Sequence, residues 1–447
     1  MKNLKLIIVF IMGFILAIGI SNAYNLNASL VTYDKKNTTL ESENVAGALN
    51  DLSIKISEGV CKNNPSPPVI KDGLIPVTIS SDGTVKYADI NSNWYNYCKK
   101  EWANAVILNS GSSYKVGDTI PESAIRAYFV WIPKYKYRLW NVGVSDTNEL
   151  VHSIDIVFDT TNTTDSSTSC ATPLTSGATG NCSNGKYMTH PAFITMNVNG
   201  FWVGKYELTG EIDNLTVKPN LVSLRSQTVS SFFSAMYNFN RNLDSHMMKN
   251  TEWGAVVYLS HSKYGIDKEI NINNNSAYKT GYSAKLTTGQ GTYPGECGDG
   301  GNYNSAYNTT IGYLASTTGN ISGIYDMAGG AFEYMASYRS GASVPTGDAK
   351  YFDVYNGASA ETTYNYRILG DATGEMGPII NYKDGDGNTR YHNKWYGDGS
   401  YFVDSTDPWF IRGSHYDRGV LAGHFIFGRH TGAANGNIGS RLVLAAK

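Results

Sequence analysis

Hydrophobic and polar positions divide the chain into an N-terminal apolar run, a short helical segment and a long region of short strands. Lys2 and Lys5 precede an apolar run over residues 6–20, and small residues follow up to Ala23. This arrangement is typical of a secretory signal. The run is shorter than the roughly 20 residues that span a bilayer comfortably, which favours cleavage after Ala23 over a permanent anchor. We therefore expect residues 1–23 to direct export.

The second pattern lies within residues 41–57, where apolar side chains recur at spacings of three and four. They are Val45, Leu49, Leu52 and Ile56. This spacing predicts a short amphipathic helix, which is too short to be stable alone. It either packs on its own domain or associates with copies of itself. Segment 24–60 resembles the stalk units of phage tail and bacterial surface proteins, and that resemblance implies a homo-oligomer.

Residues 61–125 follow as an Asn/Pro/Ser linker and a β-rich segment. Alternating residues at 75–80 and 85–87 flank the turn pair Asp82-Gly83, which predicts a β-hairpin. Several Trp and Tyr residues follow closely. We interpret this segment as a small β-rich module or as an N-terminal extension of the main domain.

The main domain is expected over residues 126–447, beginning with an apolar strand at 128–133. Strand-like segments then alternate with turns to the end of the chain, and a tract of small polar residues at 159–185 predicts an exposed insertion. Few helices are expected, at 229–239, at 250–262 and near 332–337. Many short strands with few helices indicate an irregular α+β fold.

Composition narrows the classes of partner. The chain has 36 basic and 38 acidic residues and a net charge of -2, so no electrostatic feature points to nucleic acid or an anionic membrane. Any membrane contact is expected only through an uncleaved N-terminal segment. Export permits disulfides, and Cys170 and Cys182 bracket a flexible loop that a disulfide would close. Cys61 with Cys98 is a second possible pair.

Several sequence blocks stand in a characteristic order. They are FVWIP at 129–133, FWVGKYELT at 201–209, NTEWGAV at 250–256, NISGIYDMAGGAFEY at 320–334, WFIRG at 409–413 and GSRLVL at 439–444. In this order they resemble the formylglycine-generating-enzyme (sulfatase-modifying factor) family. The resemblance implies a C-type-lectin fold and assigns structural motif positions to Trp131, Lys205, Glu207, Trp253, Asp326, Glu333, Arg412 and Arg441.

The resemblance also bears on catalysis. The family's oxidative chemistry depends on a cysteine pair near the C-terminus, whereas the last cysteine here is Cys297, upstream of both closing blocks. The His-x-x-x-His-x-Glu set of an iron-dependent branch is absent from the sequence, and so are the common hydrolase and phosphate-binding motifs. We therefore expect a protein without enzymatic activity and without a catalytic metal.

A structural calcium ion is a separate question. In the family a corner Asn and Glu often contribute ligands, but Gly330 stands in place of that Asn while Glu333 remains. The segment 384–388 has the early oxygen spacing of a calcium loop but lacks its later Gly and Glu, so it fits a hairpin turn better. We expect no cofactor, with calcium as the alternative.

Between the two closing blocks, small or apolar positions alternate with polar and aromatic ones. This pattern resembles the variable region of diversity-generating-retroelement proteins, and it predicts a ligand-binding surface. An ordinary polar surface is the alternative, and the spacing of the three histidines matches no standard metal site. The candidate ligand-binding residues are His415, Tyr416, Asp417, Arg418, His424, Arg429, His430, Asn435 and Asn437.

These observations favour a secreted or surface-displayed, adhesin-like protein that binds a protein or glycan on another surface through its C-terminal loops. Two alternatives stay open. One is a divergent oxidoreductase of the same family with displaced catalytic groups. The other is a structural subunit of a tail, pilus or surface layer, in which the helix at 41–57 matters more than the C-terminus.

Overall fold

The computed structural model describes residues 61, 64–138, 153–159, 188–284, 305–355, 379–383, 389–393, 396, 398–419, 422–445 and 447. The chain divides into two units, residues 1–63 and 64–447. The expected signal at 1–23, the helix at 41–57, Cys170, Cys182 and nearly all of the tract at 159–185 lie outside the described residues. Within the described ranges, no helix combines the length and apolar character needed to cross a bilayer.

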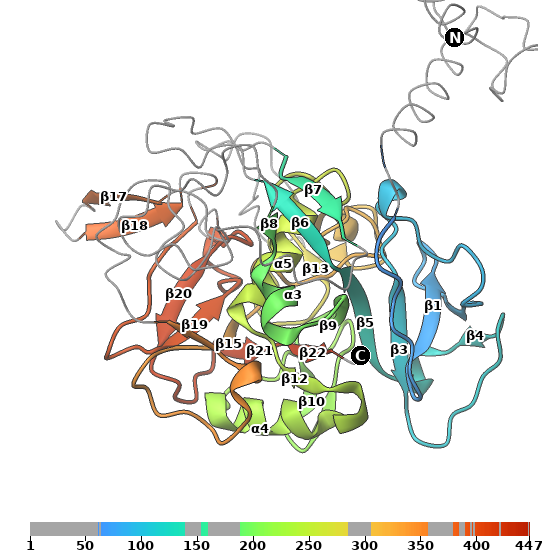
Figure 1. Cartoon of the computed structure of the whole chain (residues 1–447), viewed down its shortest axis with the longest axis horizontal. Helices are drawn as coiled ribbons and strands as arrows, with labels where there is room; N and C mark the ends of the chain where they lie inside the picture. The colour runs from blue at the N-terminus through green and yellow to red at the C-terminus, as the bar shows by residue number, and fades with distance from the viewer. Residues whose placement is uncertain are drawn as a thin grey trace, which may run out of the picture. The chain divides into compact units, whose positions relative to one another are not determined.

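The second unit is an α+β structure built mainly on two sheets (Figure 1). The larger sheet has eight strands, in the spatial order β12-β22-β9-β5-β3-β1-β2-β4. In that order the strands are Ser245–Met247, Leu442–Leu444, Gly200–Gly204, Ile125–Pro133, Asn104–Leu108, Ile75–Ile79, Val85–Tyr87 and Thr119–Ile120. The strand pairings within this sheet are all antiparallel.

The second sheet has β15 at its centre and mixes parallel with antiparallel pairs. β15 pairs in parallel with β16 and β21 and antiparallel with β19, which in turn pairs with β20. These strands are β15 Phe332–Arg339, β16 Asp353–Tyr355, β19 Trp409–Arg412, β20 Phe427–His430 and β21 Ile438–Ser440. The closing part of the chain therefore serves both sheets, since β21 belongs to the second and β22 to the first.

Smaller ladders complete the described strands. β6 (Tyr135–Arg138) pairs with both β7 (Asp155–Phe158) and β8 (Met188–Thr189). The others are the pairs β10–β11 (Thr209–Glu211 with Asn214–Thr216), β13–β14 (Tyr282–Ser283 with Ser305–Ala306) and β17–β18 (Ile379–Lys383 with Thr389–Asn393). The last pair is antiparallel on either side of residues 384–388, as a hairpin requires, although the expected turn itself lies outside the described residues.

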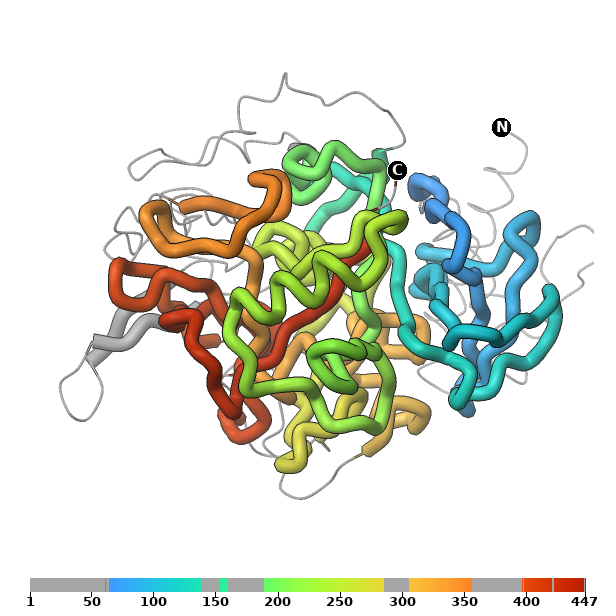
Figure 2. Tube along the Cα trace, turned by 90° about the horizontal axis from the view of Figure 1, so that it is seen from below, coloured from blue at the N-terminus to red at the C-terminus, as the bar shows by residue number. Residues whose placement is uncertain are grey.

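Three α-helices are described: α3 (Pro191–Met196), α4 (Val229–Phe239) and α5 (Asn250–Ser260). Short 3₁₀ turns lie at Tyr97–Lys99, Glu122–Ala124, Arg241–Leu243, Gly312–Ala315 and Ala349–Tyr351. The Thr228 hydroxyl caps α4 by accepting the N–H of Ser231 at 3.1 Å. In Figure 2 the yellow-green α4–β12 segment runs beside the red C-terminal segment, in agreement with the pairing of β12 with β22.

Several expected elements are confirmed. The hairpin forms with β1 antiparallel to β2, and Gly83 adopts a φ of 91°, which a side chain would disfavour. The helix at 229–239 has the expected bounds, and the helix at 250–262 ends two residues earlier, at Ser260. The helix expected near 332–337 is wrong, because this segment is strand β15, flanked by strands on both sides.

Segment 64–125 is an extension of the region that follows it. Its strands β1 to β4 continue the sheet that contains β5 and β9, and Asn104 in β3 pairs with Val130 in β5. Trp131 in β5 packs against Trp202 at 5.2 Å between ring centroids, and its indole N–H donates to the Ser66 carbonyl at 3.0 Å. Cys61 and Cys98, the second expected cysteine pair, are both disulfide-bonded.

Candidate functional site

The structural motif residues lie in the interior. Trp131, Lys205, Glu207, Trp253, Asp326, Glu333, Arg412 and Arg441 are each at most 1% exposed. Five of them, Lys205, Glu207, Asp326, Glu333 and Arg441, come from three separate sequence blocks and form one group of buried ionisable side chains, which we call the interior polar network. Buried charges are costly unless paired, so the partners of each one decide what the network does.

Arg441 and Glu333 form the central pair of this network. The guanidinium Nε of Arg441 donates to Glu333 Oε2 at 2.9 Å, and its Nη2 donates to Glu333 Oε1. Arg441 Nη1 also donates to the Gly204 carbonyl at 2.9 Å, which ties the closing block to β9. Bidentate pairing with further backbone acceptors is the geometry in which a buried ion pair is tolerated.

Lys205 and Asp326 fix the segment 321–326, which leads into a corner at residues 329–333. The Lys205 ammonium donates to Asn104 Oδ1 and to the carbonyls of Ile321 and Gly323, at 2.6–2.9 Å. Asp326 accepts from Gly281 N–H and from the Asn273 side-chain amide, both at 2.8 Å. Burial lowers the pKa of Lys205 well below its ordinary value and raises the pKa of Asp326.

Glu207 differs from Glu333 in that no basic side chain pairs with it among the described residues. Its Oε1 accepts the Ala331 N–H at 2.8 Å. Burial, and then the nearby charges of Asp326 and Glu333, raise its pKa well above the ordinary value, which favours the neutral carboxyl. A Cβ on Gly330 would lie 2.4 Å from Glu207 Oε1, and Gly330 has a φ of +70°. Glycine at 330 is therefore set by the position of Glu207 as well as by its own backbone.

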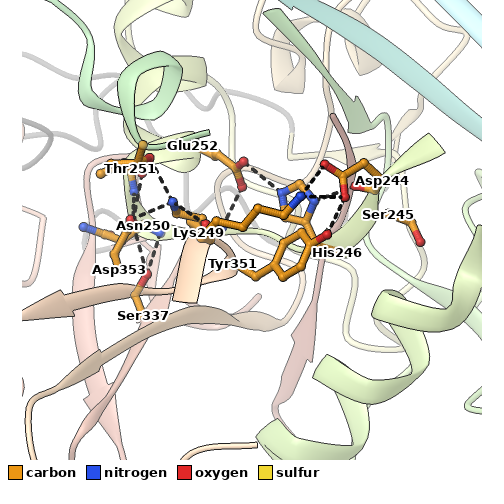
Figure 3. Close-up of polar contacts among 12 residues, drawn as sticks. Asp244, Ser245, His246, Lys249, Asn250, Thr251, Glu252, Ser337, Tyr351 and Asp353 are labelled. Carbon is orange, nitrogen blue, oxygen red and sulfur yellow. Dashed lines mark hydrogen bonds and ion pairs between the residues drawn. The ribbon is translucent and has the colours of Figure 1, made fainter. Parts of the chain in front are cut away.

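A second buried polar cluster lies at the N-terminus of α5 (Figure 3). The backbone N–H groups of Lys249, Asn250 and Thr251 donate to the side chains of Glu252, Ser337 and Asp353, respectively, at 2.7–2.9 Å. These groups would otherwise lack partners in the first turn of the helix. The cluster also holds the ion pair Lys249–Asp353 at 3.1 Å. Its side chains cap the helix, so we assign it a structural role.

The candidate ligand-binding residues fall into groups. Tyr416 is half-buried, Asp417, Arg418 and Asn437 are exposed, and Asn435 is half-buried. His415 is 7% exposed; its Nε2 accepts from Arg418 Nε at 3.2 Å and its Nδ1 lies 2.6 Å from Asp417 Oδ1. His415 thereby orients the side chains of Asp417 and Arg418. Burial lowers its pKa, which favours the neutral ring.

The remaining candidates lie elsewhere. His424 is 1% exposed and packs against Phe425, with ring centroids 4.6 Å apart, so its side chain does not reach the surface as the pattern had suggested. Arg429 Nη1 donates to the Phe402 carbonyl at 2.9 Å and lies 3.0 Å from Asp404 Oδ2. His430 Nε2 lies 3.4 Å from the Asn435 amide nitrogen. Both Arg429 and His430 are half-buried.

Tyr278 brings the exposed group together. Its hydroxyl donates to Asn437 Oδ1 at 2.6 Å, and its ring meets the Tyr416 ring at 4.9 Å in an edge-to-face arrangement. The Arg225 guanidinium carbon lies 3.7 Å from the centre of the same ring. We call this surface the aromatic face. It consists of Arg225, Tyr416, Asp417, Arg418 and Asn437 around Tyr278, which is itself only 9% exposed.

Backbone hydrogen bonds hold the segments of this face. The N–H of Tyr416 donates to the Gly330 carbonyl at 3.0 Å, and the N–H of Phe332 donates to the Asn437 carbonyl at 2.9 Å. Ser223 N–H donates to the Tyr278 carbonyl at 2.9 Å. The face therefore rests on the same corner, 329–333, that the interior polar network fixes.

Arg225 and Tyr278 were missed by sequence reasoning. They lie well before the closing blocks, and only the pairing of segment 220–226 with 278–280 on one side and 435–437 on the other brings them to the face. Tyr278 has a φ of +54°, an uncommon value for a bulky residue, but nothing in the sequence around it signals this. Their position is a property of the tertiary structure.

The alternative of a calcium ion at Glu333 meets a cation of the protein itself. Both carboxylate oxygens of Glu333 accept from Arg441, so a second cation there would meet the guanidinium charge. In the part of the chain that the structure describes, no three His, Cys, Asp or Glu side chains are grouped so that they could hold a metal ion. Residues 384–388 lie outside that part.

Comparison of the sequence with protein-family models and with curated proteins finds no match. The resemblance to the formylglycine-generating-enzyme family therefore rests on the order of the sequence blocks.

Proposed function

We propose that this protein is an exported or surface-displayed recognition protein that binds a protein or glycan ligand through the aromatic face. Its fold is then an irregular C-type-lectin-type fold that lacks the cysteine pair of the catalytic family members. The interactions that link Glu207, Asp326, Glu333 and Arg441 support this assignment, because these residues come from blocks that the resemblance places in one domain.

One observation carries the proposal: Tyr278 gathers Arg225, Tyr416 and Asn437 from three separate segments onto one surface. Aromatic rings, guanidinium groups and side-chain amides are the groups that dominate protein recognition sites. Here the Tyr278 ring is held by its contacts with Arg225 and Tyr416 and by its hydrogen bond to Asn437, so little side-chain entropy is lost when a ligand binds. The surface is therefore preorganised for binding.

The proposed ligand contacts do not use a catalytic group. Among the described residues, the imidazole that contacts the face is that of His415, and Arg418 already donates to its Nε2. That nitrogen is therefore engaged and is not positioned to accept a proton from a nucleophile, as general-base catalysis requires. The chemistry of the face is hydrogen bonding, ring stacking and charge pairing.

The test is binding of the mature chain, from residue 24, to arrays of glycans and surface proteins. We expect a ligand to be found and the double variant Tyr416→Ala/Arg418→Ala to lose at least about tenfold in affinity, since each hot-spot truncation costs more than about 1 kcal/mol. Arg429→Ala is the control, because its guanidinium is bound to the 402–404 loop. Near-UV circular dichroism verifies folding of each variant.

Two results would count against the proposal. An affinity that stays unchanged in the double variant would move the site away from the aromatic face. An Arg429→Ala variant that loses binding while the double variant keeps it would place the site on the β20 side.

A further inference from the structure

The chemical nature of the ligand can be inferred from the charge on the aromatic face. The segments that form it, 220–226, 278–280, 416–418 and 435–437, carry the cationic side chains Arg225, Lys279 and Arg418 and the single carboxylate of Asp417. Asp417 already lies 2.6 Å from His415 Nδ1. The face therefore has an excess of positive charge, although the whole chain is nearly neutral.

Arg225 is the best placed of these cations. Its guanidinium carbon lies 3.7 Å from the centre of the Tyr278 ring, within the range of a cation–π contact, and its Nη1 donates to the Gly436 carbonyl. Among the described residues it makes no ion pair, and its Nη2 donates no hydrogen bond and is not buried. Stacking fixes the direction of a donor that has no protein acceptor.

Arg241 is a stacked arginine whose guanidinium also has protein partners. Its guanidinium carbon lies 3.5 Å from the ring centre of Tyr237, a geometry close to that of Arg225 on Tyr278. However, Arg241 Nη2 donates to the Tyr351 hydroxyl at 2.8 Å and lies 3.8 Å from Asp244 Oδ1. The charge of Arg241 is therefore balanced within the protein, whereas that of Arg225 is not.

Apolar side chains lie on the same segment as Arg225. Leu221 is 42% exposed and Val222 is 52% exposed, and both belong to the stretch that pairs with 278–280. Exposed branched aliphatic side chains beside a binding surface favour contact with an apolar group of the ligand. A sugar presents mainly hydroxyl groups, whereas a polypeptide can present a carboxylate and an apolar side chain together.

We propose that the aromatic face binds a polypeptide segment in which an Asp or Glu side chain adjoins an apolar one. The Arg225 Nη2 donates to the carboxylate, and one of the two exposed aliphatic side chains of the same segment, Leu221 or Val222, contacts the apolar side chain. This inference rests on the proposed function, since it specifies the ligand of the same face.

The experiment uses the mature chain and a library of random 12-residue peptides displayed on phage. Enriched peptides are resynthesised, and each Asp or Glu is changed to Asn or Gln. We expect one such change to weaken binding at least about tenfold, the effect of a charge-assisted hydrogen bond. Arg225→Gln is expected to weaken binding of the parent peptide by a similar factor. It should not weaken binding of the amide peptide further, because the carboxylate that Arg225 would contact is already gone. Arg241→Gln is the matched control. This variant is expected to bind the parent peptide as tightly as wild type does and to bind the amide peptide as weakly.

The outcomes separate this inference from the proposed function. Enriched peptides without a critical carboxylate, or an unchanged preference in Arg225→Gln, would overturn the inference. The same holds if no peptide is enriched but a glycan array is bound through Tyr416 and Arg418, in which case the proposed function stands. If neither array nor library gives a ligand, both fail. Arg225→Lys, which keeps the charge without the planar fork, is expected to lie between wild type and Arg225→Gln.

Discussion

The interior polar network and the aromatic face use similar side chains in opposite ways. In the network, Arg441 donates to Glu333 from two nitrogens and to backbone carbonyls from Nη1 and Nη2. On the face, Arg225 is stacked on Tyr278 but makes no ion pair among the described residues. Both arginines are fixed in direction, but only one has its charge balanced by the protein.

The two regions meet at the corner 329–333, where Gly330 approaches Glu207 and its carbonyl accepts from Tyr416. This arrangement separates stability from recognition. Substitutions in the network should change the free energy of unfolding, whereas substitutions on the face should leave it nearly unchanged and alter binding. The predictions below test that separation, beginning with the largest expected effect.

Removing one member of the Arg441–Glu333 pair should destabilise the protein most. Arg441→Met leaves Glu333 buried without its cation, and we expect a loss of about 3–5 kcal/mol in the free energy of unfolding. Urea unfolding at pH 7 measures it. The double variant Arg441→Met/Glu333→Leu removes both charges and should be less destabilised than Arg441→Met alone. A double variant that costs the sum of the two single changes would show that the charges are not coupled.

Gly330→Ala should have the next largest effect. The φ of +70° costs about 1–2 kcal/mol for a residue with a Cβ, and overpacking against Glu207 adds about 1–3 kcal/mol. Gly341→Ala is the matched control, because Gly341 has a φ of +88° but no atom within 4 Å of the added Cβ. The loss of stability is read from urea unfolding midpoints. Equal losses in the two variants would mean that the Glu207 side chain shifts to make room for the new methyl group.

Glu207→Gln tests the protonation state of the network. Because the folded-state pKa of Glu207 is raised, the folded protein retains a proton that the unfolded chain loses above about pH 4.5. The stability that this carboxyl contributes is therefore present below pH 4.5 and declines as the pH rises towards the folded-state pKa, by at most about 1.4 kcal/mol per pH unit. The neutral Gln avoids this decline, so the stability difference between variant and wild type should grow in favour of the variant between pH 4.5 and 8. A constant difference would show that Glu207 is ionised in the folded protein.

Arg418→Ala should have the smallest effect on stability. The side chain is exposed, and its one described hydrogen bond is to His415 at 3.2 Å. We expect the free energy of unfolding to change by no more than about 0.5 kcal/mol. Thermal and urea unfolding of the variant provide the measurement. A loss comparable to that of Gly330→Ala would mean that the face is part of the stabilising core, and the separation of the two regions would fail.

Local sequence signals were sufficient where the element is amphipathic and capped. The helix at 229–239 has a threonine cap and one apolar side, and the hairpin at 75–87 has an Asp-Gly turn. The prediction for β15 was wrong because this strand has no amphipathic pattern. Its residues 333–337 are all buried, with strands on either side, so no alternation marks a strand and the spacing of apolar residues also fits a helix.

The missed helix α3 did have a signal. Pro191 stands at its first position, where proline is favoured, and the His190 ring caps the Ala192 N–H at 3.3 Å. The members of the aromatic face that were predicted, Tyr416 to Arg418 and Asn437, all lie between the two closing blocks. Arg225 and Tyr278 could not be predicted, because strand pairing between distant segments decides their neighbours.

The position of β22 has a consequence for biogenesis. This strand, at 442–444, lies between β12 and β9 in the eight-stranded sheet, and Arg441 immediately precedes it. Among the described strands β12 pairs with β22 alone, so it joins the sheet only after residues 442–444 have been synthesised. Under the proposed function, in which the chain is exported, this order of assembly leaves the sheet incomplete while the segments before β22 are translocated.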